Sequence, residues 1–240
     1  MECIYKVSYT HSLTQARYEH LGSRITDLIQ EKAPNAKFGL DIGAGTGGLT
    51  RKLIEKTGIT FSGVEPSLSN DKFVDGDITI LKGFAHEIPF ADNMFDVVTL
   101  TSVYEHIHPE NRFQSMKEIH RVLKSDGVLV GQIPNMYFPI ELHSRLPFQS
   151  YLPRSMGQWY LKNFSSVPWK ESGMDWFRVG PRHLRKDAFA AGFAEGRFYG
   201  ASYPADAIPA KFRWAIPILR VIPLGFDFYF RKNAGVAASN

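Results

Sequence analysis

The spacing of apolar residues changes several times along the chain, from short continuous or alternating runs to repeats of three or four residues. The first kind of spacing is typical of strands and the second of helices. Strands are predicted at 38–41, 59–64, 95–100, 128–133, 193–200 and 225–232. Helices are predicted at 18–29, 49–54, 113–123 and 181–192. Strands that alternate with helices in this way indicate an α/β sheet protein.

The first predicted strand leads directly into a cluster of glycines. The apolar run from Phe38 reaches Asp41, and Gly43, Gly45, Gly47 and Gly48 follow before the next helical pattern. Glycine has no Cβ, so such a turn can be tight and a ligand can lie against its main chain. A strand, a glycine turn and a helix in this order predict a site for a nucleotide-like ligand.

Two cofactors compete for this turn. Gly43, Gly45 and Gly48 satisfy the G-x-G-x-x-G spacing of dinucleotide-binding folds. A pyrophosphate requires positive potential, however, and the carboxylate of Asp41 opposes it. S-adenosylmethionine (SAM) has no phosphate, and its sulfonium and α-ammonium favour a nearby carboxylate. The sequence DIGAGTG, which includes Ala44, resembles motif I of class I SAM-dependent methyltransferases.

An acidic residue follows the second predicted strand. Glu65, with Pro66 after it, comes about 20 residues past the glycine turn, where a βαβ unit delivers a carboxylate to ribose hydroxyls. NAD-dependent enzymes use the same device, so Glu65 favours nucleoside binding without choosing the cofactor. A surface acid at the end of a strand is the alternative.

The segment from 81 to 99 extends the methyltransferase resemblance. LKGFAHEIPF followed by ADNMFDVVT resembles the family pattern G-D-A-x-x-L-P-F-x-D-x-x-F-D-V-V. In that pattern the residues after the first glycine flank the adenine, which implies this role for Phe84, Ala85 and His86. Phe84 replaces the usual acid that binds the adenine amino group, so stacking and backbone contacts are expected to recognise adenine.

The residues that follow the strand at 95–100 are expected to face the cofactor, beginning with Thr101 and Ser102. Glu105-His106 resembles the Glu-His pair of ubiquinone-pathway O-methyltransferases, in which an additional upstream Glu helps to hold a metal. Thr101 occupies that upstream place, so a complete metal site does not carry over and no metal is assigned. His106 is a candidate general base, because an ordinary histidine pKa is near 6.5. A structural histidine is the alternative.

The resemblance becomes specific at EIHRVLKSDGVLVGQIPN, which is similar to the family segment E-x-x-R-V-L-K-P-G-G-x-L. With motif I, it covers residues 38–135. It implies a Rossmann-like doubly wound sheet of seven strands, mostly parallel with a last antiparallel strand. We expect a single domain over 1–240, with its core at about 36–135 and 175–232, SAM as cofactor, and methyl transfer as the activity.

Residues 136–175 interrupt the regular pattern with prolines, aromatic residues and basic residues. An insertion at this point predicts a substrate lid, since aromatic side chains offer a large apolar surface with a polar edge. Its segment FPIELHSRLPF resembles bacterial methyltransferases of polysaccharide and lipid-linked sugar pathways. His143 is a second candidate base, and Glu141 and Arg145 are candidate substrate contacts. Aromatic packing of a long loop is the alternative.

Residues 207–224 place apolar side chains near one helical face with Lys211, Arg213 and Arg220 among them, although three prolines interrupt the segment. Packing on the core and peripheral contact with a membrane both remain open. Lys and Arg number 28 against 24 Asp and Glu, a bias too small to predict nucleic-acid binding. The single cysteine excludes an internal disulfide.

No signal-peptide pattern or spanning apolar segment is found, so a cytoplasmic protein, peripheral to the membrane if 207–224 meets lipid, is expected. The predicted activity is methyl transfer, O-methylation above all, to a small-molecule, lipid-linked saccharide or quinone-like acceptor. An NAD-dependent oxidoreductase and a non-catalytic SAM-binding protein are the alternatives. The sequence leaves the oligomeric state open.

Overall fold

The computed structural model describes residues 15–141, 143–168, 170–201, 217 and 221–233. The α-helices are α1 (Gln15–Lys32), α2 (Gly48–Thr57), α3 (Arg112–Val122), α4 (Arg154–Phe164) and α5 (Pro181–Ala190). The strands are β1 (Phe38–Ile42), β2 (Thr60–Val64), β3 (Lys72–Asp75), β4 (Ile78–Leu81), β5 (Phe95–Thr101), β6 (Leu123–Pro134), β7 (Phe193–Ala201) and β8 (Gly225–Lys232). Short 3₁₀ turns lie at η2 (Tyr104–His106), η3 (Pro109–Asn111), η4 (Gln149–Tyr151) and η5 (Lys170–Ser172).

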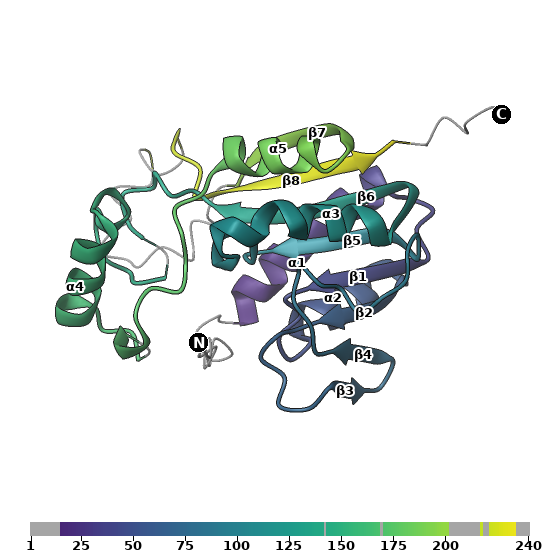
Figure 1. Cartoon of the computed structure of the whole chain (residues 1–240), viewed down its shortest axis with the longest axis horizontal. Coiled ribbons are helices and arrows are strands. Elements are labelled where there is room, and N and C mark those ends of the chain that lie inside the picture. Colours follow the sequence, from purple (N-terminus) through teal and green to yellow (C-terminus); the bar gives the residue numbers. More distant parts are fainter. Residues whose placement is uncertain (1–14, 142, 169, 202–216, 218–220, 234–240) are drawn as a thin grey trace.

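The strands form one twisted sheet in the order β3-β4-β2-β1-β5-β6-β8-β7 (Figure 1). Strands β4, β2, β1, β5 and β6 pair in parallel, and β8 pairs antiparallel with both β6 and β7. The α/β fold with a mostly parallel sheet and a last antiparallel strand is therefore confirmed. The family resemblance implied seven strands, and residue patterns placed six of them, whereas the structure has eight among the described residues.

Strands β3 and β4 were not placed from the sequence. Strand β3 pairs antiparallel with β4 around Gly76. All its residues are exposed, so no alternation of apolar and polar positions marks it. Asp75-Gly76 is a hairpin-turn signal, and Gly76 adopts a φ of 58°. For a strand of four residues outside the core, the turn that follows it is the only sequence feature that indicates a strand.

Helices cover both faces of the sheet (Figure 1). Alternate residues of one strand point to opposite faces, and β5 shows this clearly. Val97 packs with residues of α1 and α2, whereas Val98 and Leu100 pack with residues of α3 and α5. The same alternation holds in β6, where Val128 and Leu129 join different clusters. These two apolar layers pack on both faces of the sheet. They therefore fix the position of the edge where the loops after β1 and β5 begin.

The chain between β6 and α5 forms a unit beside the sheet, with α4 at its outer end (Figure 1). It has a small core of its own, built from Met136, Leu161, Val167 and Trp176. The sequence predicted an insertion here without a steady period, yet α4 is a regular helix of 11 residues. Its apolar residues were not recognised as helical because many of them face outward and few are buried.

The C-terminal segment predicted to pack on the core or to meet lipid, residues 207–224, lies for the most part outside the described residues. Among the helices that the structure describes, none combines the length and apolar character needed to cross a membrane.

Candidate functional site

The candidate site lies where the chain leaves the carboxyl ends of β2, β1, β5 and β6. The strand order reverses between β1 and β5: β2 and β4 lie on one side of β1, and β6 lies beyond β5. In open α/β sheets the crevice at such a reversal is where ligands bind. The glycine turn after β1 and the segment after β5 therefore face each other across it.

The glycine turn is held close to the segment after β5. Gly43 has a φ of 76°, and a Cβ at this position would lie 2.4 Å from Cγ2 of Val103. Its amide donates a hydrogen bond to the carbonyl of Val64 at 2.8 Å. Gly47 also has a positive φ and begins α2. Only glycine combines this backbone conformation with this close approach, so the turn is as narrow as the sequence predicted.

Asp41 lies beneath the turn and does not face the crevice. Its side chain is buried, with 2% exposure, and it accepts hydrogen bonds of 2.7 Å from the hydroxyls of Thr50 and Thr99. Burial raises the pKa of Asp41 to about 6, although both hydroxyl contacts oppose the rise. The carboxylate can therefore act on a cationic ligand through its charge, while its oxygens are already used by the protein.

Glu65 joins the glycine turn directly. Its Oε2 accepts a hydrogen bond from the amide of Gly45 at 2.9 Å, and its Oε1 accepts from the amide and hydroxyl of Ser67. Pro66, between them, is partly exposed. Ala44 is buried behind the turn, against β4 residues. The structure thus brings together the turn and the acid that were predicted to bind the nucleoside.

The residues predicted to flank adenine lie on the same side. The amide of Glu65 donates to the carbonyl of Leu81 at 3.0 Å, which places the end of β4 beside the end of β2. Phe84 and His86 follow β4, and their rings stack with centroids 5.2 Å apart. Phe84 is 40% exposed, and Ala85 packs against the core. An exposed phenylalanine ring stacked on a half-buried histidine suits stacking on a base.

After β5 the backbone turns sharply at Ser102, which has a φ of 54°. Its hydroxyl donates to Oε1 of Gln132 at 2.7 Å, and its amide donates to the carbonyl of the same residue. Left-handed backbone at a residue other than glycine is uncommon and is concentrated at functional sites. The hydroxyl of Thr101 is buried without a hydrogen-bond partner among the described residues. Sequence reasoning had not singled out Gln132.

Beyond this turn the structure assembles a cluster that no local pattern contains. Glu105 and His106 lie in η2, and His143 lies in the insertion, yet one ligand atom from each lies within 4.8 Å of the others. The rings of His106 and His143 meet edge to face with centroids 5.2 Å apart. The two histidines predicted as alternative bases are therefore neighbours in one site.

Carboxylates stand behind both histidines. Oε1 of Glu141 lies 2.7 Å from Nδ1 of His143, and Oδ2 of Asp175 lies 3.6 Å from Nδ1 of His106. Burial alone lowers the pKa of His106, but Asp175 and Glu105 outweigh it and the pKa is raised. Burial alone raises the pKa of Glu141, but His143 and Ser144 outweigh it and the pKa is lowered.

Glu141 and Arg145 were predicted as substrate contacts. Glu141 is buried, and its second oxygen accepts from the amide of Ser144 at 2.6 Å, so it orients His143. Arg145 is exposed on a turn. Trp176, which sequence reasoning missed, stacks on His143 with centroids 4.8 Å apart. The amide of Phe177 donates to the carbonyl of Glu105 at 2.8 Å and ties the end of the insertion to η2.

Comparison with known proteins supports this reading of the cofactor side. Residues 40–131 match the family described as a methyltransferase domain. An uncharacterized methyltransferase of Oceanobacillus iheyensis is 30% identical over 128 residues, which are 51% of this chain and 60% of that protein. The mitochondrial arginine-hydroxylase NDUFAF5 of Rattus norvegicus is 35% identical over 118 residues, 47% of this chain and 33% of that protein. The chain thus spans less than two thirds of either relative.

A demethylmenaquinone methyltransferase of Thermotoga maritima is 32% identical over 113 residues, 45% of this chain and 47% of that protein. Among solved structures, a SAM-dependent methyltransferase from Archaeoglobus fulgidus superposes with a TM-score of 0.59 at 20% identity, covering 90% of this chain and 94% of its own. That likeness is one of fold. The match over 40–131 includes the glycine turn, Glu65 and the segment after β5, so this part of the chain belongs to the methyltransferase domain family.

Proposed function

We propose that this protein transfers the methyl group of SAM to an oxygen of an acceptor bound between the glycine turn and the insertion. The observation that carries the proposal is the methyltransferase match over 40–131, because it spans the elements that line the cofactor side of the crevice. The acceptor oxygen attacks the methyl carbon, the carbon–sulfur bond breaks, and S-adenosylhomocysteine leaves with the bonding electron pair. The proton of an attacking hydroxyl leaves to a base or to solvent.

Cofactor binding is tested first by calorimetric titration with S-adenosylhomocysteine, with NADH titrated in parallel. Glu65→Gln removes the carboxylate beside Gly45 and is expected to weaken binding of S-adenosylhomocysteine at least about tenfold, as loss of a charged hydrogen-bond acceptor does. Glu55→Gln, an exposed glutamate on α2, is the matched control and is expected to bind as the wild type does. Binding of NADH alone would instead favour an oxidoreductase.

His106 and His143 are the groups that we propose activate the acceptor oxygen. Both lie beyond Ser102, on the side of the crevice that faces the insertion, and both have a carboxylate at Nδ1. A histidine oriented by a carboxylate is suited to take a proton. Binding of S-adenosylhomocysteine without turnover of any acceptor would favour the alternative of a non-catalytic SAM-binding protein.

The acceptor class that we propose is a quinone-like or lipid-linked molecule. The relative from Thermotoga maritima is named for a menaquinone precursor, and another relative, from Ectopseudomonas mendocina, is named a ubiquinone/menaquinone C-methyltransferase. A relative named an arginine-hydroxylase shows that names within this group of similar proteins differ in reaction. A screen of quinols and lipid-linked saccharides with labelled SAM separates transfer to oxygen from transfer to carbon.

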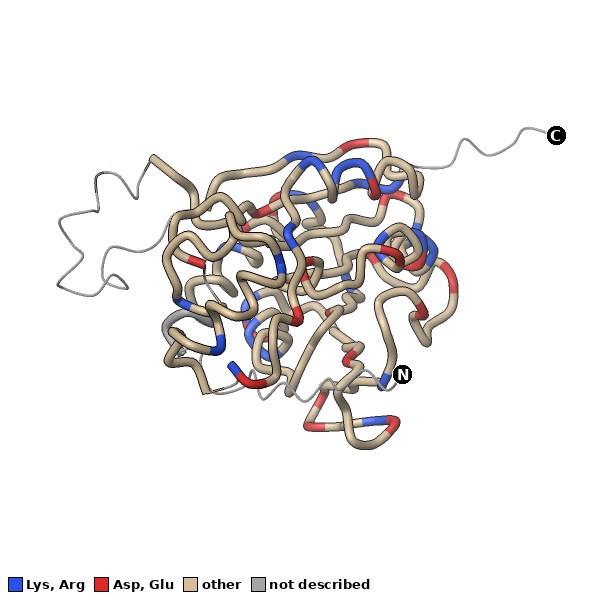
Figure 2. The backbone as a smooth tube through the Cα atoms, turned by 60° about the vertical axis from the view of Figure 1, so that its left-hand side comes forward, with Lys and Arg blue, Asp and Glu red and all other residues tan. Residues whose placement is uncertain are grey.

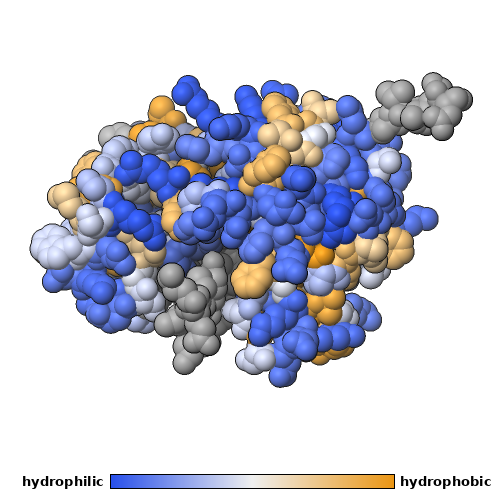
Figure 3. Space-filling model, in the orientation of Figure 1, coloured by the Kyte–Doolittle hydropathy of each residue, from blue (hydrophilic) through white to orange (hydrophobic). Residues whose placement is uncertain are grey.

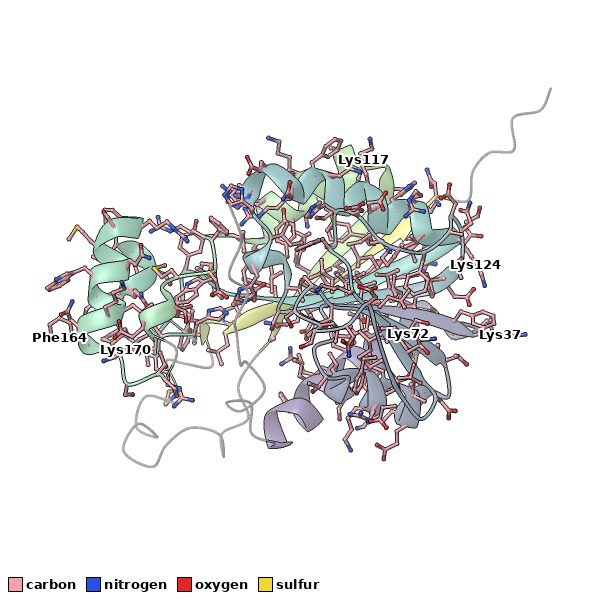
Figure 4. The ribbon with its side chains drawn as sticks, turned by 60° about the horizontal axis from the view of Figure 1, so that its bottom comes forward. Lys37, Lys72, Lys117, Lys124, Phe164 and Lys170 are labelled. Atoms are coloured by element: carbon pink, nitrogen blue, oxygen red, sulfur yellow. The ribbon has the colours of Figure 1, made fainter. Side chains whose placement is uncertain are left out.

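The outer surface of the insertion supports a membrane-associated acceptor. It exposes large apolar side chains: Tyr137, Ile140, Phe148, Tyr151, Met156, Trp159 and Phe164. Residues 142–170 contain Arg145, Arg154, Lys162 and Lys170 but no Asp or Glu. Figure 4 places Phe164 and Lys170 together at the end of the molecule that α4 forms. On the face shown in Figure 3, orange and pale residues are also seen at this end.

Aromatic side chains with basic residues are typical of surfaces that lie on anionic membranes. Elsewhere the described backbone mixes acidic and basic residues (Figure 2), so this acid-free segment stands apart. We propose that the insertion brings the protein to the membrane, as a peripheral protein. The contact expected from 207–224 stays a prediction, because most of that segment lies outside the described residues.

Sedimentation with anionic liposomes tests this surface. Lys162→Glu and Trp159→Ala are each expected to weaken binding several-fold, since one basic residue near an anionic surface contributes about 1 kcal/mol. Lys117→Glu is the matched control, because Lys117 also lies near an exposed aromatic ring, that of Phe113, but on α3. Equal loss with Lys117→Glu would mean that net charge alone determines binding.

A further inference from the structure

The starting point is a buried carboxylate that makes no hydrogen bond among the described residues. Glu105 has 0% exposure, and neither of its carboxylate oxygens has a hydrogen-bond partner among the described residues. Nε2 of His143 lies 4.0 Å from Oε1 of Glu105, which is too far for a hydrogen bond. Buried charges are almost always paired or coordinate a metal. Glu105 therefore calls for a cation beside it.

Arg112 is a buried cationic residue of the same region, but it does not pair with the carboxylate of Glu105. Arg112 is buried, and its Nε donates to the carbonyl of Ile107 at 3.1 Å. Its guanidinium lies over the rings of Tyr104 and Phe177, at 5.2 and 5.7 Å from their centroids. No ion pair within 4.0 Å joins it to Glu105 in the described part of the chain. The charge of Arg112 is felt by Glu105, but its nitrogens do not contact the carboxylate.

The groups that do surround the carboxylate are metal ligands. Glu105, His106 and His143 bring one ligand atom each within 4.8 Å of one another. Ligands about 2.0–2.1 Å from one tetrahedral zinc ion lie about 3.4 Å apart, so the three side chains need to close by roughly 1.4 Å at most. Two histidines and one carboxylate are a ligand set of catalytic zinc and of mononuclear iron(II) sites.

Carboxylates that would orient the two metal-binding histidines are already in place. Metal-binding histidines almost always present their other ring nitrogen to a carboxylate or carbonyl, which orients the ring. Here Nδ1 of His143 lies 2.7 Å from Glu141, and Nδ1 of His106 lies 3.6 Å from Asp175. Trp176 stacks on the His143 ring and limits its rotation. With Nδ1 of His143 so held, Nε2 is the nitrogen on the side of Glu105.

We infer that Glu105, His106 and His143 form a binding site for a divalent transition-metal ion. Glu141 and Asp175 orient the two histidine rings of this site. The upstream ligand of the resembled Glu-His pair is replaced by Thr101 in this chain, and in the proposed site His143 of the insertion is the third ligand instead. Three protein ligands leave coordination positions open.

The open coordination positions of the metal could bind the acceptor oxygen, and this part of the inference rests on the proposed function. A metal ion lowers the pKa of an oxygen bound to it. An acceptor with a phenol-like or enol-like oxygen would therefore bind as its anion, beside the segment that leads back to Ser102 and Val103. In that case His106 and His143 bind the metal, and proton loss from the acceptor follows from coordination.

Metal binding is tested on the full chain without any acceptor. The purified protein is stripped with a chelator and titrated with Zn²⁺, and Co²⁺ is added separately, because its visible absorption reports the coordination geometry. Wild type is expected to bind stoichiometric metal. Glu141→Gln is expected to weaken binding about 10–100-fold through the second shell, and His143→Gln is expected to weaken it more.

His108→Gln is the matched control. His108 lies two residues from His106, but its side chain is 52% exposed and its Nδ1 lies 2.9 Å from Glu110. It is expected to leave metal affinity and the Co²⁺ spectrum unchanged. Circular dichroism of the metal-free proteins checks that each variant folds.

Several results would overturn the inference. These are no metal binding by folded wild type, wild-type affinity in His143→Gln, or an equal loss in His108→Gln. The test is independent of the proposed function, because S-adenosylhomocysteine binding is measured on the same samples. Metal binding without binding of S-adenosylhomocysteine would refute the proposed function and support the metal site.

Discussion

Two buried carboxylates stand at the ends of neighbouring strands, and their surroundings differ. Asp41, near the end of β1, accepts hydrogen bonds from Thr50 and Thr99. The carboxylate of Glu105, just beyond the end of β5, has no hydrogen-bond partner among the described residues. Both are almost fully buried. The first carboxylate is satisfied by hydrogen bonds and supports the glycine turn, whereas the second has Nε2 of His143 no nearer than 4.0 Å.

The two regions also differ in how they are assembled. The glycine turn and Glu65 come from one βαβ unit, in which β1 and β2 pair directly. The histidine cluster combines η2 with an insertion that begins after β6, and the insertion has its own small core around Trp176. The cofactor side is thus a local structure on the sheet, and the other side depends on how the insertion packs.

The largest expected effect separates these two regions. Trp176→Ala removes a fully buried side chain from the insertion core, and such truncations cost about 3–5 kcal/mol of stability. Urea unfolding is expected to show this loss, while the folded variant still binds S-adenosylhomocysteine, because the glycine turn packs on other clusters. Trp176→Phe keeps a ring beside His143 and is expected to lose less. Loss of S-adenosylhomocysteine binding by folded Trp176→Ala would show that the regions are coupled.

Gly43→Ala tests the other region. Its φ of 76° and the approach of Val103 to 2.4 Å both oppose a Cβ, and we expect about 2–4 kcal/mol of destabilisation from strain and overpacking together. Binding of S-adenosylhomocysteine is expected to fall with it in calorimetry. Gly76→Ala is the control, since its φ is 58° with nothing within 4 Å of the new Cβ, and only the backbone cost of about 1–2 kcal/mol applies. Equal stabilities would contradict the prediction.

The third prediction concerns pH and Asp41. Its folded-state pKa is raised from 3.8 to about 6, so its contribution to stability is fully present below pH 3.8 and is lost as the pH rises through about 6. The rise corresponds to about 3 kcal/mol. The stability of wild type relative to Asp41→Asn is therefore expected to fall between pH 4 and pH 7 in urea unfolding. Parallel pH profiles for the two proteins would refute it.

The smallest expected effect reverses sign with metal. In chelator-treated protein, Glu105→Gln removes a buried carboxylate that makes no hydrogen bond among the described residues and is expected to stabilise the fold by about 1–3 kcal/mol. Added Zn²⁺ is expected to stabilise wild type but not the variant, as a ligand that binds only the folded state does. Asp41→Asn serves as the comparison, and its response to Zn²⁺ is expected to match that of wild type. A wild type that is indifferent to Zn²⁺ would count against the metal site.

Much of the fold could be predicted from the sequence because it depends on patterns that are local. The bounds of β8 and the start of α5 at Pro181 agree with the structure, since alternation and an initial proline act within a few residues. The exposed strand β3 had no apolar pattern. Helix α4 has few buried residues, and many of its apolar side chains face outward, so it was not predicted either.

The sequence by itself determined the glycine turn, the position of Glu65 after the next strand and the methyltransferase resemblance of residues 38–135, because short-range spacing sets the geometry of one βαβ unit. Only the tertiary structure decided that Asp41 is covered by two hydroxyls and that Glu141 orients His143. It alone decided that His143 and Trp176 meet Glu105 and His106. These groups lie far apart along the chain, and their contacts depend on how the insertion packs at the sheet edge. The spacing of residues within either segment does not predict that packing.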